Sequence, residues 1–285
     1  MPVLRTENLS LSYDATPVVS GLSVEIPAGQ ITVIVGANAC GKSTLLRGLA
    51  RLLTPQGGAV YLDEVDLARL SGGALATKLG MLPQQPVAPE GITVSDLVGR
   101  GRHPHQRWFR QWSEDDERVV AAALQATGAT ELADRSLDEL SGGQRQRVWI
   151  ALALAQDAET MLLDEPTTFL DLAHQLEILD LVHDLNHDRG KTIVLVLHDL
   201  NLAARYAHHL IALKHGKVVA VGTPSEVVTA EVVEEVFGLA CEVITDPLTG
   251  TPLVLPRPRR PQASESTPAE PTGGRRRSVP YCRPG

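Results

Sequence analysis

The segment that most constrains this chain is Gly36-Ala37-Asn38-Ala39-Cys40-Gly41-Lys42-Ser43, which fits the pattern G-x-x-x-x-G-K-[ST]. It follows the β-branched run Ile31–Val35 and precedes Thr44–Leu53, a stretch with helical spacing. In such a strand–loop–helix unit, the loop N–H groups and the helix N-terminus present partial positive charge to phosphates. Lys42 is expected to reach the β- and γ-phosphates of a nucleotide, and Ser43 to bind Mg²⁺. The motif therefore predicts a nucleoside triphosphate site.

A second apolar run ends in two acidic residues and supplies the other half of this site. Thr160–Leu163 reads as a buried strand, and Asp164 and Glu165 follow it directly. Asp164 is expected at the sheet edge beside the phosphate loop, where it would help to hold Mg²⁺. Glu165 is expected to act as a general base on a water, a role worth about 10²–10⁴-fold in rate. The alternative is that Asp164 and Glu165 simply end a strand with solvated charge, and the phosphate loop argues against it.

A third segment, Leu140-Ser141-Gly142-Gly143-Gln144-Arg145-Gln146-Arg147, has two interpretations. Ser141 and Gln144 have the spacing of a capping box, which would explain them structurally. Gly142 and Gly143, however, each cost about 1 kcal/mol relative to Ala inside a helix. Glycines suit this position if a phosphate approaches the backbone closely. Because the chain already has one phosphate loop, the segment indicates a nucleotide shared between two copies.

In this order and spacing, the three segments resemble those of the ATPase subunits of ATP-binding-cassette (ABC) transporters, and the similarity covers roughly residues 2–255. The resemblance implies ATP and Mg²⁺ as cofactors and an α/β fold, with a P-loop NTPase (RecA-like) core. It further implies an antiparallel β subdomain and, at about residues 86–155, a helical subdomain specific to the family. The nucleotide-binding domain would then be residues 1–255.

The resemblance also assigns roles to single residues. Tyr13 would stack on adenine, worth about 1–3 kcal/mol, and the alternative is that it packs on its own sheet. Gln84, rather than Gln85, would contact Mg²⁺ and the attacking water, and His198 would contact the γ-phosphate. Asp171 would couple the two sites of a dimer. The nucleotide contacts implied in addition are the phosphate loop with Thr44 in one copy and Ser141, Gly142, Gly143 and Gln144 in the other.

The chain departs from the family pattern at Ala39, where glycine is usual, and at Ala37, where proline is frequent. A Cβ at position 39 disfavours a positive φ by about 1–2 kcal/mol. We therefore expect weaker hydrolysis than is typical, and an Ala39→Gly variant that binds ATP and keeps or raises turnover.

The remaining pattern alternates strands and helices and predicts a mostly parallel sheet. A capping box at Ser113–Asp116 opens a helical stretch that runs to about Ala155. The other predicted elements are a strand at Val60–Leu62, a helix at Leu172–His187, a strand at Thr192–Leu197 and a hairpin of Glu242–Thr245 with Thr251–Leu255. Residues 256–285 are rich in Pro, Arg, Ser and Gly and predict a disordered tail.

Charge and hydropathy restrict the partners. The formal net charge is −8, and residues 256–285 hold seven Arg and two Glu, so residues 1–255 carry −13. An acidic body argues against nucleic acid as a partner. No run approaches the roughly 20 apolar residues that span a bilayer, the first residues lack a secretory signal, and three scattered cysteines indicate a reducing compartment. With the family resemblance, this places the chain at the cytoplasmic face of the membrane, held there by two transmembrane permease subunits.

The region between Gln84 and Ser141, above all Gly101–Gln106, resembles ATPases of ferric-siderophore importers, which also act with a substrate-binding protein. Haem or cobalamin import is the alternative cargo, and a soluble ABC ATPase or a regulatory module without turnover is the alternative class. His103 and His105 lie in a basic cluster with Arg102, Arg107 and Arg110, so contact with another subunit is favoured over metal binding. For the pair His183 and His187, a solvated surface is favoured. Cys40, inside the phosphate loop, is a candidate target of thiol reagents.

Overall fold

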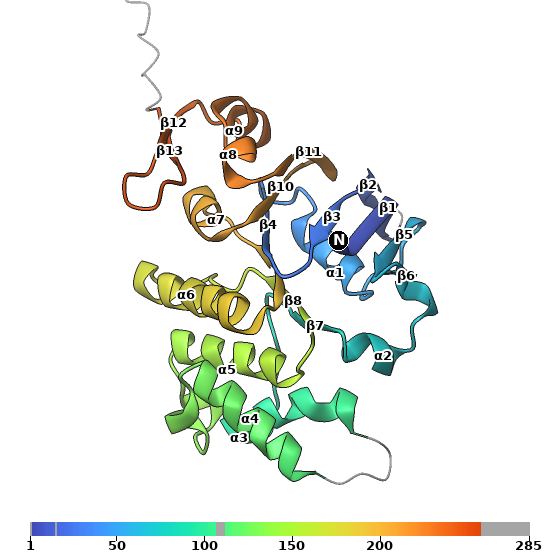
Figure 1. Ribbon diagram of the computed structural model, residues 1–285, viewed down its shortest axis with the longest axis vertical. Coiled ribbons are helices and arrows are strands. Elements are labelled where there is room, and N and C mark those ends of the chain that lie inside the picture. Colours follow the sequence, from blue (N-terminus) through green and yellow to red (C-terminus); the bar gives the residue numbers. More distant parts are fainter. Residues whose placement is uncertain (1, 15, 107–111, 258–285) are drawn as a thin grey trace, which may run out of the picture.

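Five buried strands running in parallel form the centre of the molecule, which the computed structural model describes over residues 2–14, 16–106 and 112–257. The sheet has the order β11-β10-β4-β9-β8-β7, with β11 antiparallel at one edge. Its strands are β4 (Ile31–Gly36), β7 (Leu79–Leu82), β8 (Thr160–Asp164), β9 (Thr192–Val196), β10 (His209–Lys214) and β11 (Lys217–Gly222) (Figure 1). Every residue of β4, β8 and β9 is buried, as in sheets covered on both faces. The predicted mostly parallel α/β sheet is confirmed.

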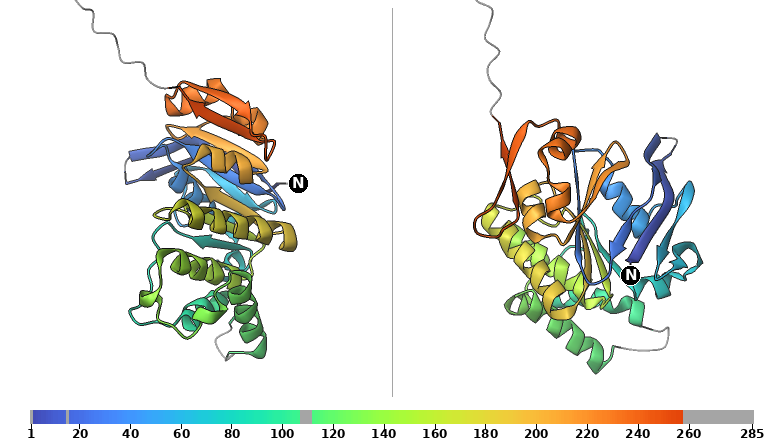
Figure 2. Two further views of the ribbon diagram at one scale, coloured as in Figure 1. Left: turned by 90° about the vertical axis from the view of Figure 1, so that its left-hand side faces the viewer. Right: turned by 45° about the horizontal axis from the view of Figure 1, so that its top comes forward.

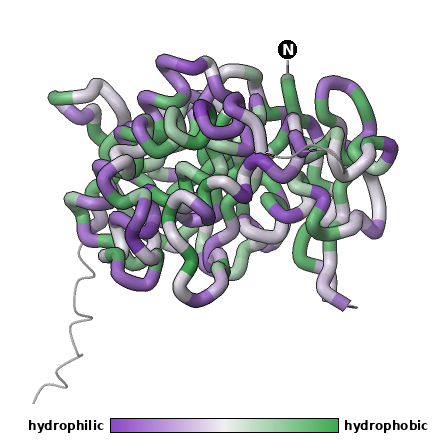
Figure 3. Tube along the Cα trace, turned by 90° about the horizontal axis from the view of Figure 1, so that it is seen from below, coloured by the Kyte–Doolittle hydropathy of each residue, from purple (hydrophilic) through white to green (hydrophobic). Residues whose placement is uncertain are grey.

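Alternate side chains of the central strands enter two different cores. On β4, Val33 and Val35 face the core shared with the helices, whereas Ile34 faces the core shared with the antiparallel strands. On β8, Leu163 and Leu162 divide in the same way. In Figure 3 hydrophobic segments gather toward the middle of the tube and hydrophilic ones toward its outside. Strands β4 and β8 are therefore apolar on both faces, and this is why they could be predicted from uninterrupted apolar runs in the sequence.

An antiparallel subdomain lies beside the phosphate loop. It consists of β1 (Pro2–Tyr13), β2 (Thr16–Leu22), β3 (Glu25–Pro27), β5 (Gly57–Leu62) and β6 (Val65–Asp66). Helix α1 (Lys42–Leu49) packs against it so closely that a Cβ on Gly48 would lie 2.5 Å from Cδ1 of Leu11. Compared with the predicted helix Thr44–Leu53, α1 begins two residues earlier and ends at Leu49. It stops there because Arg51 turns into the left-handed region, with φ 56°.

The helical subdomain contains α3 (Val94–Gly99), α4 (Glu114–Ala126) and α5 (Gly142–Ala155). The predicted capping box is confirmed, since the Ser113 hydroxyl and the Asp116 carboxylate each pair with the other residue's backbone N–H. The helical pattern expected from Ser113 to Ala155 is interrupted, however. After Gly128, at φ 62°, the chain forms two short 3-10 turns at Thr130–Leu132 and Leu137–Glu139. A positive φ ends a helix, and the glycine marks that point.

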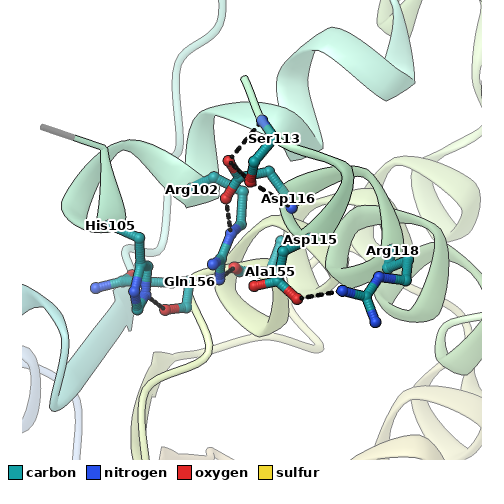
Figure 4. A network of polar contacts seen from close by, with 8 residues as sticks. All are labelled: Arg102, His105, Ser113, Asp115, Asp116, Arg118, Ala155 and Gln156. Atoms are coloured by element: carbon teal, nitrogen blue, oxygen red, sulfur yellow. Dashed lines mark hydrogen bonds and ion pairs between the residues drawn. The ribbon is translucent and has the colours of Figure 1, made fainter. Parts of the chain in front are cut away.

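A buried ion pair holds this subdomain together (Figure 4). Arg102, in the 3-10 turn Arg100–His105, donates from Nε to Oδ1 of Asp116 at 2.9 Å and from Nη1 to the carbonyl of Ala155 at 3.0 Å. Both side chains are under a tenth exposed. His105 Nε2 lies 2.8 Å from the carbonyl of Gln156. Arg102 thus connects the turn to the start of α4 and to the end of α5. The turn and α4 flank residues 107–111, which the structure does not describe.

The last part of the described chain packs on the same face of the sheet as the helical subdomain, and its last helices lie beside β10 and β11 at the sheet edge (Figure 2). It contains α6 (Leu172–Arg189), α7 (Leu200–Tyr206), α8 (Pro224–Val227), α9 (Ala230–Phe237) and the hairpin β12 (Cys241–Thr245) with β13 (Pro252–Pro256). The remaining helix, α2 (Gly72–Ala76), belongs to an earlier part of the chain and lies beside β7. The predicted hairpin is confirmed, and Asn201 on α7 anchors it through two hydrogen bonds to Val254. The expected disordered tail lies outside the described residues after Arg257. Within the described ranges, no helix combines the length and apolar character needed to cross a bilayer.

Candidate active site

The phosphate loop lies at the carboxyl end of β4 and leads into α1. Gly36 begins it at φ 153°, and a Cβ there would lie 2.3 Å from the carbonyl oxygen of Leu213. Only glycine avoids that clash. Lys42 is buried, and its Nζ donates to the carbonyls of Gly36 at 2.9 Å and Ala37 at 3.0 Å. Ala39 has φ 58°, so the loop adopts at this position the positive φ that a Cβ disfavours.

A cavity of about 500 Å³ opens over this loop. Its lining comprises Val18, the loop and helix start from Asn38 to Thr44, and three side chains from elsewhere in the chain: Gln84, Glu165 and His198. Sequence reasoning missed Val18. Nothing local marks it, because it reaches the cavity only through the packing of β2 against the loop, where a Cβ on Gly41 would lie 3.4 Å from Cγ1 of Val18.

Asp164 sits directly behind the loop. Ser43 Oγ donates to its Oδ1 at 2.8 Å across 121 residues of sequence, as expected for a strand end beside the phosphate loop. Burial raises the pKa of this carboxyl, although the hydrogen bond from Ser43 opposes the rise. Its second oxygen, Oδ2, is buried without a hydrogen-bond partner among the described residues. A hydroxyl and a carboxylate oxygen are the donors that Mg²⁺ prefers, so these residues fit that ion.

Glu165 faces the cavity and is held by three neighbours. Its Oε2 accepts from Nε2 of Gln84 at 2.6 Å and from the hydroxyl of Thr168 at 3.0 Å, and lies 2.7 Å from Nε2 of His198. Its backbone is in the left-handed region, with φ 52°, which turns it away from the direction of Asp164. The carboxylate side chain is 9% exposed, whereas His198 is 47% exposed. Three segments far apart in sequence thus converge on one carboxylate.

Tyr13 lies at the end of β1, 41% exposed, and is not part of the cavity lining. Its hydroxyl accepts a hydrogen bond from Nη1 of Arg47 at 3.0 Å. The structure thus places it near α1 rather than over the cavity, so its predicted stacking on adenine stays a prediction.

Comparison with known proteins agrees with this geometry. A sequence model described as "ABC transporter" matches residues 19–168. The chain belongs to the ABC transporter family. The ferric enterobactin transport ATP-binding protein FepC of Escherichia coli is 54% identical to it, over 89% of this chain and 93% of the relative. The iron(3+)-hydroxamate import ATP-binding protein FhuC of Bacillus subtilis is 49% identical, over 90% and 95%.

A solved dimer has the same fold. It is the ATP-binding cassette MJ0796 in a post-hydrolysis state with ADP and Pi, with a TM-score of 0.68 and 30% identity. The alignment covers 77% of this chain and 98% of the cassette. As an ABC ATPase the chain uses ATP, and the expectation of a P-loop NTPase fold of this family is confirmed.

The segment Ser141–Gln144 begins α5, apart from the cavity just described. The capping box is formed: Gln144 N donates to Ser141 Oγ at 3.3 Å, and Ser141 N to Gln144 Oε1 at 3.1 Å. Gly142 is exposed, and a Cβ there would meet its nearest neighbour, Leu170, at an ordinary 3.6 Å. Gly143 is buried, and a Cβ there would lie 2.5 Å from Cδ2 of His174. The second glycine therefore has a packing reason that sequence alone did not reveal.

Asp171 caps α6 and likewise does not line the cavity. Its Oδ1 accepts a hydrogen bond from the backbone N–H of His174 and a second one from the His174 ring. The backbone hydrogen bond first, and then the one from the ring, lower the pKa of the Asp171 carboxyl. Beside it, Phe169 is 90% exposed with φ 66°, and Leu172 is 65% exposed. Two large apolar side chains on either side of a capping residue are typical of a contact surface.

The histidines considered as metal ligands do not gather into a site. Over the described ranges, no three His, Cys, Asp or Glu side chains come together in a way that could hold an ion. His183 and His187 stack at 6.2 Å and each lies beside its own Asp neighbour. Arg107 and Arg110, which entered the argument about His103 and His105, lie outside the described residues. Cys40 is 4% exposed, and burial raises the pKa of its thiol.

Proposed function

We propose that this ABC ATPase powers the import of ferric siderophores. The two relatives described above, named for ferric enterobactin and for iron(3+)-hydroxamate, align with nearly the whole described chain at 49–54% identity. A fold alone supports many functions, so the cargo is argued from this close similarity and the reaction from the site.

The observation that carries the reaction is the convergence of Gln84, Thr168 and His198 on Glu165 at the rim of the phosphate cavity. Glu165 takes a proton from the attacking water, and Gln84 and His198 orient its carboxylate toward the γ-phosphate. Lys42 and the loop N–H groups bind the phosphates. Mg²⁺, when bound by Ser43, Asp164 and Gln84, supplies neutralising charge to the phosphate oxygens.

Two copies share each nucleotide. The phosphate loop of one copy and the segment Ser141–Gln144 of the other would enclose the triphosphate, with Asp171 beside them. This arrangement is supported by the separation of that segment from the cavity within one chain and by the exposed Phe169 and Leu172 next to Asp171. ATP shifts the pair toward the closed form because it binds that form more tightly.

The chain would act at the cytoplasmic face of the membrane, attached to two transmembrane permease subunits through its helical subdomain, at about residues 86–155. A substrate-binding protein would deliver the cargo to the permease on the other side, without touching this chain. Residues 1–255 would form the nucleotide-binding domain, and residues 256–285 a tail.

Uptake of labelled cargo in cells lacking this chain tests the proposal. Re-expression of the wild type should restore uptake of ferric siderophore, and Glu165→Gln should not, because loss of the base lowers turnover about 10²–10⁴-fold. Glu159→Gln is the matched control, since Glu159 is exposed and immediately precedes β8, at the opposite end of that strand. It should behave as wild type.

Two outcomes would contradict the proposal. If haem or cobalamin uptake is lost and ferric siderophore uptake persists, the cargo is wrong. If the tagged chain brings down no multi-span membrane subunits and no uptake changes, a soluble ABC ATPase replaces the importer subunit as the explanation.

A further inference from the structure

The loop that joins β8 to α6 is fixed at both of its ends. At its start, the Thr168 hydroxyl donates to Oε2 of Glu165 at 3.0 Å. At its end, Nε2 of Gln175 donates to the carbonyl of Leu170 at 2.8 Å. The position of Asp171 is thus linked through a short, hydrogen-bonded stretch to the carboxylate in the cavity.

His174 makes a second, side-chain contact with Asp171. Besides the backbone hydrogen bond of the helix cap at 3.0 Å, its ring Nδ1 lies 2.8 Å from the same oxygen, Oδ1. An ionised carboxylate only accepts hydrogen bonds, so Nδ1 carries the proton and donates. A helix cap requires the backbone hydrogen bond alone. The ring contact is therefore additional to capping.

The other edge of the same ring lies against α5. A Cβ on Gly143 would lie 2.5 Å from Cδ2 and 3.2 Å from Nε2 of His174. The ring thus occupies space that any residue other than glycine would fill. One side chain therefore contacts both Asp171 and the Ser141–Gln144 segment, the two parts that one copy would offer to the nucleotide of its partner.

We propose that His174 is a positioning residue that holds Asp171 and the Ser141–Gln144 segment in one fixed arrangement. This inference rests on the proposed ATP-bound dimer. His174 acts through Asp171 and Gly143 and touches no nucleotide. Its loss would leave the monomer folded and its own phosphate cavity intact, and would weaken the closed dimer.

Two variants separate the two contacts. His174→Phe keeps a ring against Gly143 and removes the Nδ1 donor, whereas His174→Asn keeps a donor for Asp171 and removes the ring. Both keep the backbone N–H that caps α6, so a purely structural capping role would leave the dimer unchanged. His183→Phe is the matched control, because His183 lies on the same helix and its nearest carboxylate, that of Asp184, is 3.8 Å away.

The assay is the ATP concentration needed for half-maximal dimer formation in a Glu165→Gln background, measured by light scattering, together with kcat and KM of the single variants. His174→Phe should raise that concentration about tenfold and lower kcat by a similar factor, the effect of one charge-assisted hydrogen bond. His174→Asn keeps a donor for Asp171 but loses the ring against Gly143, so it should raise that concentration about threefold, less than His174→Phe and more than His183→Phe. Binding of a fluorescent nucleotide to the monomer, and the melting temperature, should stay at parent values.

The inference is overturned if His174→Phe forms dimers within twofold of the parent, or if His183→Phe is impaired to the same degree. It is also overturned if His174→Phe lowers monomer nucleotide binding as strongly as dimer formation. Failure of the proposed function looks different: the Glu165→Gln parent itself would then form no dimer with ATP.

Discussion

Ala39→Gly is the sharpest test of the phosphate-loop geometry, because Ala39 holds φ at 58° in the loop that we propose binds the nucleotide. An L-residue in the left-handed region costs about 1–2 kcal/mol, which glycine removes. Glycine also adds about 0.4–1 kcal/mol of unfolded-state entropy that folding must overcome. The net expectation is a stabilisation between about 0 and 1.6 kcal/mol, or a melting temperature higher by up to roughly 5 °C.

Urea unfolding and steady-state ATPase assays measure the two consequences of this substitution. The free energy of unfolding should rise with an unchanged m-value, the dissociation constant for ATP should stay within about twofold, and turnover should be kept or increased. Ala37→Gly is the control, since Ala37 has no positive φ and the same substitution should destabilise by about 0.4–1 kcal/mol. A loss of stability in Ala39→Gly equal to that of Ala37→Gly, or a large loss of turnover, would refute the strain argument.

Two further predictions concern other parts of the chain. Burial alone would raise the pKa of Asp116, but hydrogen bonds from Arg102 and Ser113 hold it below its usual value, so the buried pair should lose stability as the pH falls through that lowered pKa. At pH 7, Arg102→Ala should cost about 3–5 kcal/mol in urea unfolding, and Arg102→Met with Asp116→Leu markedly less; equal costs would contradict the argument. Burial raises the pKa of the Cys40 thiol, so iodoacetamide at pH 7.5 should modify Cys40 in the folded chain at under about one tenth of its rate in urea. Peptide mass mapping measures both rates, and fast modification of the folded chain would disprove that the thiol is buried.

The parts of the site that sequence predicted are those with local causes. The phosphate loop needs glycines at fixed places between a strand and a helix, so Gly36 and Gly41 carry their own structural meaning. The capping boxes at Ser113 and Ser141 depend on residues three positions apart. The fully apolar strands β8 and β9 were recognisable because both of their faces are buried.

The parts that sequence missed depend on contacts between distant segments. Strand β7 has only four residues and contains Gly80, so it carries no strand pattern of its own, and β10 and β11 were not anticipated either. The packing of His174 on Gly143 and the pairing of Arg102 with Asp116 join different helices or turns. Periodicity within one segment contains no information about such partners. Gly143 was therefore explained by the close approach of a phosphate, and Arg102 was interpreted as one member of a basic cluster.

The strand order of the central sheet determines when the pocket first exists during synthesis. The phosphate loop follows β4 and Asp164 ends β8, yet these strands do not touch, because β9 lies between them and pairs with both. β9 is made after both of its neighbours, since it spans Thr192–Val196. A nascent chain that has emerged only as far as Asp164 holds both halves of the proposed magnesium and phosphate site without the strand that aligns them. Nucleotide can therefore assist the folding of this protein only late in translation, once β9 has left the ribosome.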